Sequence, residues 1–326
     1  MDHRESNEVV NLDEFPFFHI YFSDDEPSGF VSKSDSLLSF NMFGTCSLRN
    51  VKRVIRRNRR LKLLRVHLLK AVLDLCKAAN LEPFVYGGTA LSVFRENGKF
   101  IPHDTDIDLG ILEFDSEGNG SYTKLIHYCL QNGIHVNGVE NLDNSLLCSG
   151  DSDLYIDFSS SIGKRFWLKA RHFNVSETIE ELPYNGCDCK RIKCFYSTNG
   201  LLKACNLYNL NRKIVNHILS DPSLVHVDLF TLSIYPDSSA GLKHLRVNWN
   251  LPGIYDCEKK LFPYNAFFPL KPCIFEDVNL LAPCDLQTYL SIEYGYLGRD
   301  AVYDSKRQLF IKIPSCYLKQ LPSYFT

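Results

Sequence analysis

The sequence has no long apolar run. Nowhere among its 326 residues do 18 apolar residues follow one another, as a membrane-spanning helix would require. Its first ten residues, MDHRESNEVV, are polar and lack the apolar core of a secretory signal peptide. We therefore expect a cytoplasmic protein without a transmembrane segment. The alternative is the secretory pathway or a host compartment, reached by a route that the sequence does not reveal.

The chain also has little net charge and no internal repeat or low-complexity tract. A formal charge of −2 gives no bulk reason to expect nucleic acid or an acidic membrane as a partner. With 45% hydrophobic and 13% aromatic residues, the composition is that of a globular protein. Strand and helix patterns mix without regular βαβ alternation, which favours the α+β class. We divide the chain into an irregular N-terminal extension over residues 1–50 and one domain over residues 51–326.

The twelve cysteines include no C-x2-C pair, the usual mark of a structural zinc site. Cys76 and Cys129 lie inside apolar patterns, where a free cysteine packs as a small hydrophobic residue. We interpret most of the cysteines as reduced thiols. The alternative is a zinc site with the spacing C-x-C-x4-C-x10-C, formed by Cys187, Cys189, Cys194 and Cys205.

The most informative stretch is FVYGGTALSVFRENGKFIPHDTDIDLGIL, residues 84–112. Its pattern predicts a strand over Phe84–Tyr86, a helix over Thr89–Asn97 and a second strand over Thr105–Leu112. A Gly87-Gly88 turn at the start of a helix allows the backbone to approach a phosphate closely. A glycine pair alone more often marks an ordinary turn.

Three aspartates in this stretch, Asp104, Asp106 and Asp108, are spaced two apart. In a strand they would share a face, about 6–7 Å apart, and repel one another by roughly 2–3 kcal/mol per pair. A bound divalent cation, Mg²⁺ or Mn²⁺, is the common reason for such a row. A calcium loop is excluded because its sixth position, here Leu109, requires glycine, and its twelfth, here Asp115, requires glutamate.

A third carboxylate on a neighbouring strand would complete a site for phosphoryl transfer. The alternating segment at 225–235 carries Asp228, and the LYIDF segment carries a rival, Asp157. A helical pattern over residues 51–79 begins with a basic run at 52–65. That run is either a solvated helix face or a cationic patch for phosphate, a nucleotide or an anionic acceptor.

The segment YGGTALSVFRENGKFIPHDTDIDLGI resembles the central motif of the LicD and fukutin family, within the nucleotidyltransferase superfold related to polymerase β. HVDLFTLSIYP and FFPLKPCIFEDVNLLAPCDLQTYLSIEYG are similar to later blocks of the family, in the same order. The resemblance covers roughly residues 60–298. It implies a mixed sheet flanked by helices. From Phe262 the chain itself is rich in proline and aromatic residues. His103 departs from the family pattern, which usually has tryptophan there.

Members of this family transfer a phosphorylated alcohol, such as phosphocholine or ribitol phosphate, from a CDP-activated donor to a hydroxyl acceptor. The resemblance therefore implies Mg²⁺-dependent transfer to a hydroxyl acceptor of the glycan kind, with release of CMP. One alternative is nucleotidyl transfer from a nucleoside triphosphate to a protein, RNA or small molecule. Another is a non-catalytic scaffold that retains the fold.

The resemblance also implies roles for individual residues. Asp106 and Asp108 would bind the metal, and Asp104 would support them. Asp228, which the resemblance favours over Asp157, would be a metal ligand or the base for the acceptor hydroxyl. The residues implied for the donor's phosphates are Gly87, Gly88, Thr89, Arg95 and Lys271.

Overall fold

The structure, a computed structural model, describes residues 48–101, 104–114, 118, 120–137, 152–158, 191–236, 243–248, 260–298, 301–304 and 309–312. The predicted extension lies outside these ranges except for its last three residues, which begin a helix. His103, Cys187 and Cys189 also lie outside them.

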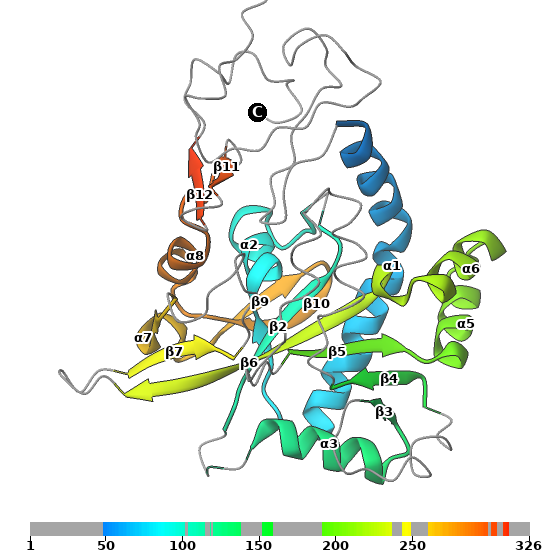
Figure 1. The fold of residues 1–326 in the computed structure, drawn as a ribbon, viewed down its shortest axis with the longest axis horizontal. Helices are drawn as coiled ribbons and strands as arrows, with labels where there is room; N and C mark the ends of the chain where they lie inside the picture. Colours follow the sequence, from blue (N-terminus) through cyan, green and yellow to red (C-terminus); the bar gives the residue numbers. More distant parts are fainter. Residues whose placement is uncertain are drawn as a thin grey trace, which may run out of the picture.

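A mixed eight-stranded sheet forms the centre of the described structure (Figure 1). Its main order is β1-β2-β6-β5-β4-β3, and β7 extends it by pairing with both β6 and β8. The pairs β2/β6 and β3/β4 are parallel, and the other pairs are antiparallel. This confirms the predicted α+β class. The strands are β1 (Phe84–Val85), β2 (Ile107–Leu112), β3 (His135–Asn137), β4 (Leu154–Asp157), β5 (Arg191–Tyr196), β6 (His226–Pro236), β7 (Lys243–Val247) and β8 (Phe262–Pro263).

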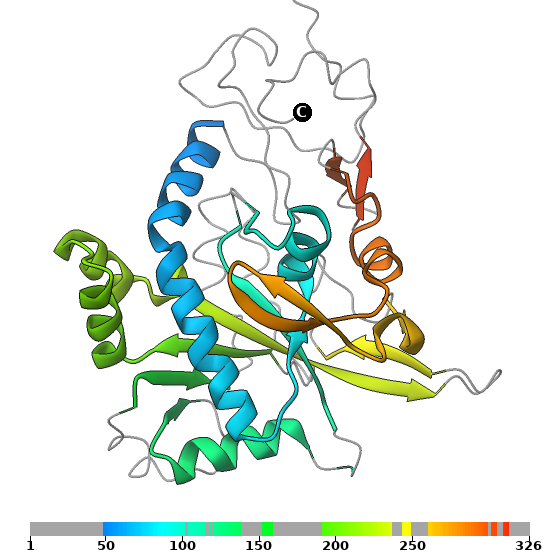
Figure 2. The ribbon, with the colours of Figure 1, turned by 180° about the vertical axis from the view of Figure 1, so that it is seen from behind.

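Helices flank this sheet, and the longest, α1, packs across β5 and β6 (Figure 2). None of the helices in the described ranges combines the length and the apolar character needed to cross a membrane. The helices are α1 (Leu48–Ala78), α2 (Gly87–Arg95), α3 (Ser121–Gln131), α5 (Thr198–Leu207), α6 (Arg212–Ser220), the 3-10 turn η5 (Pro222–Leu224), α7 (Tyr264–Phe267) and α8 (Leu286–Tyr294). Two hairpins complete the fold, β9 (Lys271–Phe275) with β10 (Val278–Ala282), and β11 (Ala301–Asp304) with β12 (Leu309–Lys312).

Alternation along the central strands separates an apolar face from a polar one. Ile107 and Leu109 of β2 and Val227 and Leu229 of β6 are fully buried. Each such side chain stabilises the fold by about 1.5–3 kcal/mol through burial. Because side chains two apart share a face, the intervening Asp108 and Asp228 lie together on the opposite face.

The acidic strand is shorter than predicted. It begins at Ile107, the first residue of β2 paired with β6, rather than at Thr105. The chain turns just before it, where the Asp104 amide donates to the Ile101 carbonyl at 2.9 Å. Asp104 and Asp106 therefore lie on the segment that leads into β2, and only Asp108 belongs to the strand.

The C-terminal segment, rich in proline and aromatic residues, packs onto the main sheet. Phe267 of α7 and Tyr289 of α8 are fully buried, with ring centroids 4.8 Å apart. At the turn of the β9/β10 hairpin, the buried Glu276 carboxylate pairs with Lys62 of α1 at 2.5 Å. These contacts make the segment part of the same core as α1 and the sheet.

Candidate metal centre

The register of the parallel strands places two aspartates side by side. Asp108 of β2 is directly opposite Asp228 of β6. In the same row, Lys193 of β5 follows Asp228, and Asp157 of β4 follows Lys193. The structure therefore brings Asp228, and not Asp157, next to Asp108.

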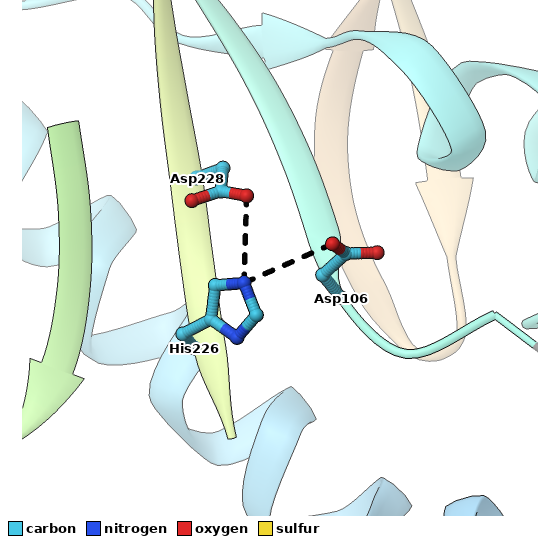
Figure 3. A group of neighbouring side chains, drawn as sticks. All are labelled: Asp106, His226 and Asp228. Atoms are coloured by element: carbon cyan, nitrogen blue, oxygen red, sulfur yellow. Dashed lines mark ion pairs between the residues drawn. The ribbon is translucent and has the colours of Figure 1, made fainter. Parts of the chain in front are cut away.

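Asp106, His226 and Asp228 form a group whose ligand atoms all lie within 4.8 Å of one another (Figure 3). His226 Nε2 is 3.4 Å from Asp228 Oδ2 and 3.8 Å from Asp106 Oδ2. Asp228 and His226 are buried, whereas the Asp106 side chain is 26% exposed. The group can bind a metal ion.

One atom of this group is direct evidence that a cation can bind here. Asp228 Oδ1 is buried and has no hydrogen-bond partner among the residues that the structure describes, and such an acceptor is unfavourable unless a cation or donor satisfies it. Carboxylates suit Mg²⁺ and Mn²⁺, while an imidazole ligand also suits metals such as Zn²⁺. The donor set therefore fits a divalent ion without determining which one.

His226 was not among the predicted site residues. Its position two residues before Asp228, in the HVD sequence of an alternating strand, was the available signal, because the two side chains must share a face. The proximity of His226 to Asp106 depends on the pairing of β2 with β6, which the local pattern does not show.

Asp228 is held in its charged form by a neighbouring cation. Arg191 of β5 donates a hydrogen bond from Nη2 to Asp228 Oδ2, and both side chains are buried. Burial alone would raise the pKa of Asp228, but Arg191, and then His226 and Lys193, hold that pKa below its ordinary value.

The carboxylates of Asp104 and Asp108 approach the first turn of α2. Desolvation, and then the charge of Asp106, raise the pKa values of Asp104 and Asp108 well above the ordinary value. The Gly88 amide donates to Asp108 Oδ2 at 3.0 Å, and the Asp108 amide donates to Thr89 Oγ1 at 2.8 Å. A divalent cation would relieve the repulsion among these carboxylates.

The glycine pair approaches carboxylates in the structure. A Cβ atom on Gly88 would lie 2.5 Å from Asp104 Oδ2, and one on Gly87 would lie 2.6 Å from Asp108 Oδ2. Gly87 has a φ of +50°, which favours glycine. Its amide donates to the Tyr289 hydroxyl at 2.9 Å. The backbone donors predicted to hold phosphate thus contact protein atoms here.

Two predicted cations have other contacts. Arg95 ends α2, where its Nε donates to Glu96 Oε1 at 2.9 Å and its Nη1 donates to the Leu297 carbonyl at 3.2 Å. Lys271 begins β9 and donates to the Cys284 carbonyl at 2.8 Å. In the described part of the chain, neither forms an ion pair with the aspartates of the site.

The basic run is not only a solvated helix face. Two of its polar side chains, Arg65 and Asn58, form a buried clamp, a set of hydrogen bonds to backbone carbonyls. Arg65 of α1 donates to the Leu224 carbonyl from Nε at 3.1 Å and from Nη2 at 2.9 Å, and to the Asp104 carbonyl from Nη1 at 3.5 Å. Asn58 donates to that same Asp104 carbonyl at 2.5 Å. Burial lowers the pKa of Arg65 to about 10, against the opposing charges of Asp106 and Asp104. Residues of α1 therefore hold the segments that lead into β2 and β6.

The described cysteines are free thiols, and several are buried as predicted. Cys194 of β5 faces the core, where burial, and then the neighbouring Cys76 and Cys129, raise the pKa of its thiol. Cys205 of α5 is also buried. Because Cys187 and Cys189 lie outside the described residues, the four-cysteine zinc site stays a prediction.

No model of a known protein family matches the chain, and no curated protein is similar enough to count as a relative. The resemblance to the LicD and fukutin family therefore rests on the motifs alone.

Proposed function

We propose that this protein transfers a phosphorylated alcohol from a CDP-activated donor to a hydroxyl acceptor, with the help of a divalent metal ion. The observation that carries the proposal is the gathering of Asp106, Asp108 and Asp228 at the start of two adjacent parallel strands. Phosphoryl transfer needs carboxylates that fix a cation beside the donor's phosphates.

Asp106, His226 and Asp228 would hold the metal. A bound divalent ion would neutralise the diphosphate of the donor and stabilise the negative charge on the phosphoryl oxygens. Gly88 and Thr89 fix Asp108 beside this group through their hydrogen bonds. Arg65 and Asn58 hold the backbone carbonyl of Asp104.

The reaction is an in-line displacement at phosphorus. The acceptor oxygen forms a bond to the phosphorus that carries the alcohol, and the bond from that phosphorus to the bridging oxygen breaks. The bridging oxygen leaves with CMP, and the acceptor's hydroxyl proton passes to water or to a carboxylate of the site. What supports a CDP-alcohol as donor is the resemblance of the three sequence blocks. A glycan as acceptor and phosphocholine or ribitol phosphate as the group transferred belong to the same proposal.

Nucleotidyl transfer would use the same metal and the same carboxylates, so the product distinguishes the two reactions. The purified protein is incubated with Mg²⁺ or Mn²⁺ and a panel of CDP-alcohols and nucleoside triphosphates, together with glycan acceptors, and CMP and pyrophosphate are measured. We expect CMP from a CDP-alcohol. Asp106→Asn should lower the rate about 10²-fold, since a preorganised electrostatic contact is lost.

Asp277→Asn is the matched control, because this exposed aspartate pairs with Lys70 at the surface, away from the site. It should leave the rate within about twofold, as surface substitutions usually have small effects. Pyrophosphate released from a triphosphate would instead establish nucleotidyl transfer. A protein that shows no turnover and binds no nucleotide would contradict both reactions and favour the scaffold.

A further inference from the structure

Arg191 is a buried cation that forms an ion pair inside the acidic site. It is the first residue of β5, directly opposite Phe230 of β6. Its guanidinium carbon lies 5.1 Å from the centroid of the Phe230 ring, and its side chain is only 7% exposed. The hydrogen bond to Asp228 Oδ2 links it to the carboxylate that is also part of the metal group.

The other arginines of the site region have fixed contacts elsewhere. Arg65 donates to two backbone carbonyls, and Arg95 contacts Glu96 and the segment after α8. Of these three arginines, Arg191 is the one that forms an ion pair with a carboxylate of the metal group. A diphosphate bound at this metal group would therefore lie beside Arg191.

A metal ion at Asp228 would lie close to Arg191, because Arg191 bonds Oδ2 while Oδ1, the other oxygen of the same carboxylate, has no hydrogen-bond partner among the described residues. Two cations on one buried carboxylate would repel each other, and in such a site of low dielectric this repulsion is stronger than in water. A guanidinium also carries a planar fork of donors that matches two phosphate oxygens, and a phosphate is a good substitute for a carboxylate partner. The cation–π contact with Phe230 uses none of the hydrogen-bond donors of the guanidinium, so this contact does not prevent them from binding a phosphate.

We propose that Arg191 is a phosphate-binding residue, which leaves Asp228 when a divalent ion binds that carboxylate and then contacts the diphosphate of the donor. This inference rests on the proposed function for the identity of the donor. It does not rest on it for the exchange of Asp228 between Arg191 and the metal.

The inference predicts opposite effects of one substitution on two ligands. Arg191→Gln removes a positive charge next to the metal ligands, so Mn²⁺ should bind about tenfold more tightly. The same change removes the phosphate contact, so inorganic pyrophosphate and CDP-choline should bind roughly 10-fold to 10²-fold more weakly at saturating Mn²⁺. If Arg191 had only a structural role, its replacement would weaken the binding of both ligands together.

Isothermal titration calorimetry measures both affinities in wild type, Arg191→Gln and Arg191→Lys. Lysine keeps the charge but lacks the fork. Arg191→Lys should therefore keep the Mn²⁺ affinity within about threefold of wild type and still lower the affinity for pyrophosphate. The matched control is Arg246→Gln, in which the lost arginine lies on β7 over the Tyr235 ring, 4.0 Å from its centroid. This control should leave both affinities unchanged, and circular dichroism checks the folding of each variant.

Weaker Mn²⁺ binding in a folded Arg191→Gln protein, or unchanged pyrophosphate binding, would overturn the inference. Should the glutamine variant not fold, Arg191→Lys decides: weaker pyrophosphate with retained Mn²⁺ supports the inference, and unchanged pyrophosphate overturns it. A wild type that binds Mn²⁺ and pyrophosphate but no CDP-alcohol would count against the proposed function alone.

Discussion

Gly88 lies where the first turn of α2 meets two carboxylates. Its amide donates to Asp108 Oδ2 at 3.0 Å, and a Cβ atom there would lie 2.5 Å from Asp104 Oδ2. A side chain at this position would therefore displace the Asp104 carboxylate. The glycine is required by the close approach of helix and acids.

Gly88→Ala should separate the site from the stability of the fold. Alanine is favoured over glycine inside a helix by up to about 1 kcal/mol. We therefore expect the free energy of unfolding, measured in urea, to change by no more than about 1 kcal/mol. The displaced carboxylate should lower Mn²⁺ affinity about tenfold, because carboxylate geometry sets metal binding. Calorimetric titration with Mn²⁺ checks this, and wild-type affinity in the variant would show that the approach has no functional role.

Individual residues show where sequence reasoning succeeded and where it stopped. The alternation of apolar and acidic residues placed Asp108 and Asp228 on the polar faces of their strands, and the structure agrees. The same reasoning did not include His226, and the contacts of Arg95 lie at the far end of α2. A local pattern shows which way a side chain faces, but not which distant atom it meets.

At the scale of elements, α1 does more than cover the sheet. Its apolar residues at spacings of three and four predicted the buried face, and Leu64 and Leu68 are fully buried. Arg65, within the basic run, holds the Leu224 carbonyl ahead of β6 and the Asp104 carbonyl ahead of β2. Which basic residue is buried depends on carbonyls far along the chain, so the sequence of the run could not show it.

Arg65→Met should destabilise the protein by about 2–4 kcal/mol, because buried carbonyl groups lose their donor at roughly 1–3 kcal/mol each. Urea unfolding measures the change. Arg60→Met, on the exposed side of the same helix, is the matched control and should change stability by less than about 0.5 kcal/mol. Equal stabilities of the two variants would exclude the clamp.

Two further helices follow patterns that are readable in the sequence. SYTKLIHYCLQ has a helical pattern and forms α3, Ser121–Gln131, and the helical pattern that begins near Cys284 stops before Gly295, where α8 ends at Tyr294. The patterns did not predict α5, α6 or the β9/β10 hairpin. Helices α5 and α6 span ten residues or fewer and each strand of the hairpin spans five, and periodicity over so few residues is a weak signal until packing selects one conformation.

At the scale of the whole molecule, the sheet order creates the site. Strand β6 is central, since it pairs with β2, β5 and β7. Its parallel pairing with β2 brings Asp228 beside Asp108, although 120 residues separate them in the sequence. No single stretch specifies such a long-range pairing, so the local patterns left Asp157 as a rival third carboxylate, and the family resemblance was what favoured Asp228.

Titration of the whole protein with Mn²⁺ tests the acidic metal site most directly. Calorimetry measures the affinity, and thermal unfolding measures the stabilisation. At a free metal concentration of about 100 times Kd, binding should stabilise the fold by about 2.7 kcal/mol and raise Tm. Asp106→Asn should lower the affinity at least about tenfold, while Asp277→Asn should match wild type. A wild type that binds neither Mn²⁺ nor Mg²⁺, or an Asp106→Asn variant that binds as tightly as wild type, would contradict the assignment of this site.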